Sequence, residues 1–85
     1  MSDSGAEELL AQQLGRHIAQ LRVARGLSQE ALAHRAKISN NHVQLLESGL
    51  SDRQKKSPAN PRLGTLLSLS RALDVPLATL LDGIG

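Results

Sequence analysis

The segment 27–49 constrains the fold more than any other part of the chain, because it carries start and stop signals for two short helices. Ser28 and Ser39 stand where helix N-caps are expected, since a serine hydroxyl can accept from a free backbone N–H of the first turn. Glu30 places a negative charge in the first of these turns. Gly49 ends the second helix, because glycine reverses the chain there without steric cost. The sequence therefore predicts two helices joined by a tight turn.

The second of these helices has a polar outward face with no evident structural purpose. Val43 and Leu46 point inward, whereas Asn40 and Asn41 open the helix although asparagine is a poor helix former. Carboxamides donate and accept at once, which suits the N6 and N7 edge of adenine, and simple assistance to the cap is the competing explanation. The pattern is the layout of a helix-turn-helix, whose second helix enters the DNA major groove. We interpret the outward residues Asn40, Asn41, Gln44 and Leu45 as base-reading.

The segment resembles the helix-turn-helix of the phage-repressor and Cro-like proteins, the XRE family. The resemblance covers about Leu14 to Gly83 and implies an all-α, compact five-helix bundle of the lambda-repressor-like type, with the motif at the second and third helices. The residues that carry it are Leu27-Ser28-Gln29-Glu30, Leu32-Ala33, Ala36, Ile38-Ser39, Val43, Leu46-Glu47-Ser48-Gly49, Asn60-Pro61-Arg62-Leu63, Thr65-Leu66-Leu67, Ala72-Leu73-Asp74-Val75, Pro76-Leu77 and Leu80-Leu81.

The remaining helices follow from apolar spacing. The first is expected over about 6–25. Gly15 interrupts its apolar pattern, so an alternative is that the regular helix begins only near Gly15. We therefore divide the chain into an acidic segment at 1–13, partly disordered or helical, and a DNA-binding domain at 14–83. The fourth helix follows Pro61, which suits a first helical position, and the fifth begins near Pro76.

Composition narrows the class of protein. The 85 residues allow one domain with a small core, and the complete lack of Phe, Trp and Tyr requires an aliphatic core. It also argues against single-strand binding by base stacking. The absence of cysteine excludes disulfides and thiolate metal sites, and no apolar run approaches the ~20 residues of a membrane span. The N-terminus does not resemble a signal peptide. A cytoplasmic protein without a cofactor is the default expectation.

An enzyme is not expected. His17, His34 and His42 fall on three different predicted helices, and no metal-ligand spacing or pairing of a nucleophile with a base is visible. His17 and His34 are expected at the surface. His42 either contacts DNA or flanks the helix, and both interpretations remain open.

Positive charge is concentrated in the middle of the chain. Residues 16–62 carry nine Lys or Arg against three acidic residues, a net charge of +6, whereas the whole chain has +2. Such a region supplies the salt-dependent, sequence-independent part of DNA affinity, and a solvated surface is the alternative. Arg53, Lys55 and Lys56 cluster in the long loop 50–60. This loop lies over phosphates, is a mobile insertion, or contacts a dimer partner.

The resemblance assigns further roles. Arg22 and Glu47 match a salt-bridged pair that ties the first helix to the third and orients the recognition helix. Gln29 matches a phosphate contact at the start of the second helix, although capping would also explain it. Further phosphate contacts are expected from the loop cations and from residues around the third helix and the start of the fourth. The full set is Gln29, Ser39, His42, Ser48, Arg53, Lys55, Lys56 and Arg62.

Two residues depart from the family pattern. Lys37 stands where the family usually has glycine, at a turn position that tends to need a left-handed backbone and costs another residue roughly 1 kcal/mol. The turn is therefore either strained at Lys37 or shaped differently. Leu45 stands where similar proteins often carry a polar base-reading residue. It either touches a thymine methyl or packs against a neighbouring helix.

These observations predict a transcriptional regulator that binds specific double-stranded DNA as a homodimer on a near-palindromic operator. The alternatives are an antitoxin that also binds a toxin, and a protein-interaction module that has lost DNA binding. The candidate dimer residues near the C-terminus, for which ordinary core packing is the competing role, are Leu77, Leu80, Leu81 and Ile84.

Overall fold

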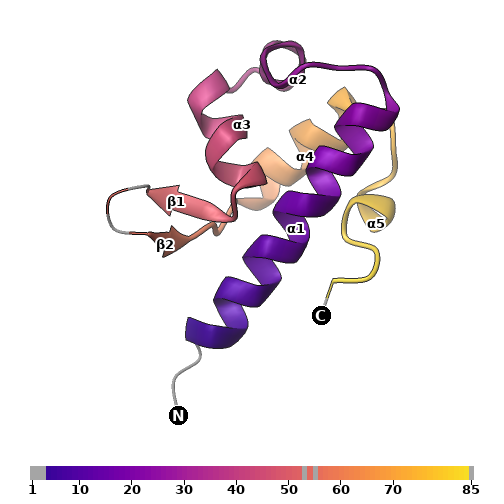
Figure 1. Ribbon diagram of the computed structural model, residues 1–85. Coiled ribbons are helices and arrows are strands. Elements are labelled where there is room, and N and C mark those ends of the chain that lie inside the picture. The colour runs from indigo at the N-terminus through magenta and orange to yellow at the C-terminus, as the bar shows by residue number, and fades with distance from the viewer. Residues whose placement is uncertain (1–3, 53, 55, 85) are drawn as a thin grey trace.

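The computed structural model describes residues 4–52, 54 and 56–84. Five helices pack around one core, and a small hairpin projects from one side of it (Figure 1). The helices are α1 (Ser4–Ala24), α2 (Gln29–Ala36), α3 (Asn40–Glu47), α4 (Leu63–Ala72) and α5 (Leu77–Leu80), and the strands are β1 (Leu50–Asp52) and β2 (Ser57–Pro58).

The core is aliphatic, as the composition requires. Its fully buried side chains come from all five helices, so each helix is stabilised by packing against the others. Each such side chain removed from water contributes about 1.5–3 kcal/mol. The largest of them are Ile18, Leu32, Val43, Leu69, Leu73 and Leu80.

Serine caps start α2 and α3 as the sequence predicts. The Ser28 hydroxyl accepts from the backbone N–H of Ala31 at 3.0 Å, and the Ser39 hydroxyl accepts from that of His42 at 3.0 Å. Each cap satisfies one of the backbone donors that the first turn leaves without a helical partner. The local chemistry of two serines therefore fixes where the motif's helices begin.

The segment expected to be a loop contains an antiparallel hairpin, so the all-α description needs correction. Leu50 pairs with Pro58 and Asp52 with Ser57, and the register shifts between these pairs. Asp52 Oδ1 accepts from the Gln54 N–H at 2.8 Å, which tightens the turn. Strands of three and two residues are too short to show an alternating pattern in the sequence.

The structure also corrects two helix starts. α1 runs unbroken through Gly15, which does not interrupt it. Pro61 is not the first helical residue of α4, because Arg62 has an extended backbone and the helix begins at Leu63. The proline instead restricts the chain just before the helix.

Gly15 is needed because α1 and α3 approach each other at their backbones. A Cβ at Gly15 would overlap the Leu46 carbonyl oxygen and lie 2.9 Å from the Glu47 carbonyl oxygen. Gly49 makes a second such contact, since its Cβ would lie 3.1 Å from the Gln12 Cα. The end of α3 is therefore seated directly on α1.

α5 is held by a hydrogen bond that the sequence did not indicate. The His17 Nδ1 lies 2.8 Å from the Leu80 carbonyl oxygen, across 63 positions of the chain. His17 is half-buried, so its expected place at the surface was wrong, whereas His34 is exposed. One side chain of α1 thus positions the C-terminal helix.

Replacement of Gly15 by alanine is expected to lower the free energy of unfolding by about 1–3 kcal/mol, because backbone atoms cannot move aside for the new methyl group. Denaturant unfolding followed by circular dichroism measures this, since the chain has no Trp or Tyr. Gly64→Ala is the matched control: nothing lies within 4 Å of its added Cβ, and it should stabilise by up to about 1 kcal/mol. Equal effects at the two glycines would contradict the close approach.

Candidate nucleic-acid interface

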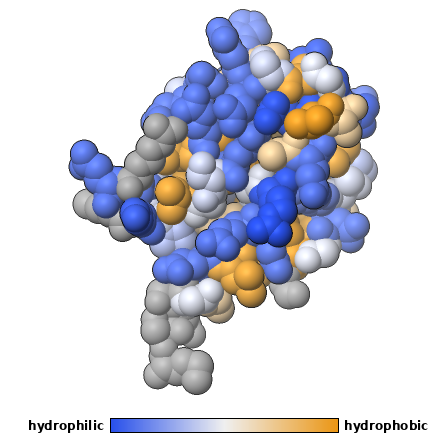
Figure 2. All heavy atoms as spheres, in the orientation of Figure 1, coloured by the Kyte–Doolittle hydropathy of each residue, from blue (hydrophilic) through white to orange (hydrophobic). Residues whose placement is uncertain are grey.

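The outward face of α3 begins with two exposed carboxamides. Asn40 and Asn41 are exposed in the first turn, while Val43 and Leu46 are buried against the core. Gln44 and Leu45 are half-buried one turn further on. Figure 2 shows a largely hydrophilic surface over α2 and α3. The helix thus presents hydrogen-bonding groups at the end with which groove-reading helices contact bases.

A network of three side chains fixes the other end of α3. Glu47 receives the Arg22 guanidinium in a two-point contact, with Nε to Oε2 at 2.7 Å and Nη2 to Oε1 at 3.1 Å. Arg22 Nη1 also donates to the Leu27 carbonyl oxygen at 2.8 Å. Only 16% of the Arg22 side chain and 7% of the Glu47 side chain are exposed, so water screens the pair weakly. The network holds α3 to α1 and to the start of α2.

Gln29 belongs to the same network. Its Nε2 donates to Glu47 Oε1 at 2.9 Å, which the sequence did not indicate. An amide nitrogen carries two hydrogens, so this bond leaves one hydrogen with which Gln29 could reach a phosphate. Its phosphate contact stays a prediction.

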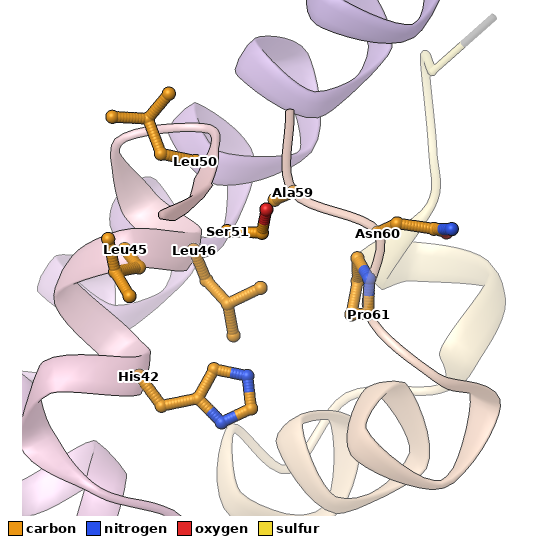
Figure 3. A pocket seen from close by; sticks show the side chains of 8 residues that line it. All are labelled: His42, Leu45, Leu46, Leu50, Ser51, Ala59, Asn60 and Pro61. Atoms are coloured by element: carbon orange, nitrogen blue, oxygen red, sulfur yellow. The ribbon is translucent and has the colours of Figure 1, made fainter. Parts of the chain in front are cut away.

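His42 is turned towards a small cavity of about 100 Å³ beside α3 (Figure 3). Its ring and Leu46 point into this cavity, opposite Pro61, whereas the Asn60 amide points away. His42 is half-buried there. Its flanking role and its expected phosphate contact both stay predictions.

Leu45, on α3, lines two hollows beside the hairpin. It lines the cavity of Figure 3 together with Leu50 and Ser51. It also lines a more open groove of about 350 Å³ with Asn41 and Gln54. Its half-buried side chain therefore faces the space between α3 and the hairpin, beside Asn41.

The other expected phosphate contacts that the structure describes lie at the two ends of α3, in the hairpin and just before α4. Ser39, Ser48, Lys56 and Arg62 are exposed, and the Ser48 hydroxyl donates to the Gln44 carbonyl oxygen at 2.8 Å. Arg62 precedes α4 without a side-chain cap bond. The expected contacts at Arg53 and Lys55 lie outside the described residues.

The turn between the two helices has the backbone that its position predicts. Lys37 has φ 59° and ψ 40°, the left-handed conformation for which glycine is the unstrained residue. The Ile38 N–H donates to the Ala33 carbonyl oxygen at 3.0 Å, which closes the end of α2.

The two capped helices, the tight turn and the exposed first turn of α3 form one motif, and a family model described as a helix-turn-helix domain matches residues 13–82. The chain belongs to the XRE-type helix-turn-helix family. Within the described part of this family member, no helix is long and apolar enough to cross a membrane.

Solved structures of other helix-turn-helix proteins are similar. The restriction-modification controller protein C.AhdI from Aeromonas hydrophila is 31% identical, with 84% of this chain and 94% of that chain covered and a TM-score of 0.67. SinR, a master regulator for biofilm formation solved in complex with DNA, is 30% identical, with coverages of 81% and 98% and a TM-score of 0.67. The controller protein C.Esp1396I shares the fold, with a TM-score of 0.72. It is 18% identical, with 89% of this chain and 88% of that chain covered. No curated protein matches the chain.

Removal of the Glu47 charge tests the network. Glu47→Gln keeps the shape of the side chain and is expected to lower the free energy of unfolding by about 1–3 kcal/mol, because the largely buried Arg22 guanidinium loses its anionic partner. Denaturant unfolding and affinity for a selected duplex are measured together. Glu30→Gln, at an exposed acidic residue of α2, is the control. Unchanged stability and affinity for Glu47→Gln would rule out the orienting role.

Proposed function

We propose that this protein is a sequence-specific regulator that binds double-stranded DNA, as a homodimer, on a near-palindromic operator. The exposed pair Asn40 and Asn41 at the start of α3 carries this proposal. Side-chain carboxamides read adenine well in the major groove, and Leu45 beside them suits a thymine methyl. The Arg22–Glu47–Gln29 network and the Gly15 contact support it, because base reading requires a recognition helix held in one orientation.

Phosphate contacts would fix the register of the duplex on this helix. Ser39 lies at one end of α3, Ser48 at the other, and Arg62 precedes α4. Lys56 is exposed on the hairpin. The relative SinR, solved in complex with DNA, supports the same partner for this chain.

The proposed dimer uses the C-terminal end of the chain. Leu80 is fully buried and Leu77 packs against the core, so these two residues do not supply a free surface. Leu81 remains 38% exposed and Ile84 is half-buried. Figure 2 shows apolar surface between the N-terminal part of α1 and this C-terminal turn. The proposed interface therefore centres on Leu81, because Ile84, like Leu77, packs against the core.

Selection of bound sequences from random duplexes tests the function. A near-palindrome with half-site centres about one helical turn apart is expected, with affinity that falls steeply with salt. Asn41→Ala should weaken the selected site by about 1–3 kcal/mol and relax one base position in each half-site. Salt-dependent binding without sequence preference would contradict specific regulation. A complete lack of duplex binding would favour the protein-interaction module, and capture of a toxin by the same chain would favour the antitoxin.

Leu81→Asp tests the dimer. The substitution places a charge in the proposed apolar interface, so sedimentation should show a monomer at concentrations where the unchanged protein is a dimer. Leu63→Asp is the matched control, because Leu63 is more exposed, at 63%, and lies at the start of α4. A dimer that survives Leu81→Asp would place the interface elsewhere.

A further inference from the structure

The same backbone motif closes three helices of this protein with three different residues. At the ends of α1, α2 and α4, one residue takes a positive φ and the next donates its N–H to the carbonyl oxygen five residues back. The residue with positive φ is Gly26 (φ 70°), Lys37 (φ 59°) and Asp74 (φ 56°), respectively. Glycine is unstrained there and aspartate tolerates the conformation, whereas a lysine is disfavoured.

No stabilising contact of the Lys37 side chain offsets this strain among the described contacts. Lys37 is exposed, and Arg35 already places a cation in the last turn of α2, where the helix dipole favours one. A non-glycine residue held in a sparsely populated conformation indicates a function for its side chain.

The position of Lys37 indicates which function. It stands two residues before the α3 N-cap Ser39, so their Cα atoms are at most about 7.6 Å apart. The major groove is about 12 Å wide, so a helix that lies in it has a row of phosphates along each side. Lys37, just before the helix, is therefore within reach of one of these rows. Lysine offers a strongly hydrated point charge on a long flexible stem, which suits a phosphate.

We propose that Lys37 binds a DNA phosphate at the wall of the groove that receives the first turn of α3. This inference rests on the proposed function. It assigns a role to a cation that the sequence pattern left unassigned. Lys37 lies at the start of α3, whereas the hairpin and its Lys56 follow the end of α3. The charge contributes to affinity, whereas the backbone that carries it is strained.

Opposite effects on stability and binding test the proposal. Lys37→Gly relieves the strain and should raise the Tm by roughly 4–8 °C. It should also weaken the selected duplex roughly fivefold per bound chain at physiological salt, and lower the slope of log affinity against log salt by about 0.9 per bound chain.

Two further variants at the same position separate charge from backbone freedom. Lys37→Gln keeps the strain and removes the charge, so it should lower affinity and salt slope without a gain in Tm. Lys37→Arg keeps both and should leave all three quantities close to those of the unchanged protein. Loss of affinity in Lys37→Gly but not in Lys37→Gln would assign the effect to a loosened turn and overturn the phosphate contact.

Asp74→Gly is the matched control, because it removes a side chain from the same motif at the end of α4. A smaller rise in Tm with unchanged affinity is expected. A fall in Tm for Lys37→Gly, or an unchanged salt slope, would overturn the inference while the proposed function stands. If the unchanged protein binds no duplex, the proposed function and this inference both fail.

Discussion

Direct backbone contact between α1 and the end of α3 determines how the recognition helix is held. Gly15 of α1 admits the carbonyl groups of Leu46 and Glu47, and Gly49 admits the backbone of α1 at Gln12. Two helices can approach this closely only where side chains are missing. The Arg22–Glu47 ion pair then fixes the rotation of α3, with Gln29 as a third partner. The exposed carboxamides owe their orientation to these contacts at the other end of the helix.

The parts of the fold that could be predicted are those with local chemical signals. Ser28 and Ser39 mark helix starts because a hydroxyl caps the first turn, whatever the rest of the chain does. The left-handed turn at Lys37 was expected from the family resemblance, because glycine usually stands at this position. The family resemblance adds the pairing of Arg22 with Glu47, which the structure places in an ion pair.

Features that depend on distant contacts could not be predicted. Gly15 was expected to interrupt α1 because glycine is a weak helix former, and only the position of α3 explains its presence within the helix. The hairpin has too few residues for a strand pattern, and the bond from His17 to Leu80 joins residues 63 positions apart. In the candidate site, the exposure of Asn40 and Asn41 followed from helical spacing, whereas the cavity that Leu45 lines together with hairpin residues did not.

α1 contacts both the recognition helix α3 and the C-terminal helix α5, which lies next to the proposed dimer interface. It carries Gly15 and Arg22 against α3, and His17 against the Leu80 carbonyl oxygen of α5. In a dimer joined near Leu81, the separation of the two recognition helices would therefore be set in each subunit by the part of α1 that carries these three contacts. In such a dimer the separation of the two recognition helices could change little. An operator with its half-sites moved apart by a base pair would have to accommodate the mismatch by bending or untwisting the DNA, at a deformation energy that depends on the sequence between the half-sites.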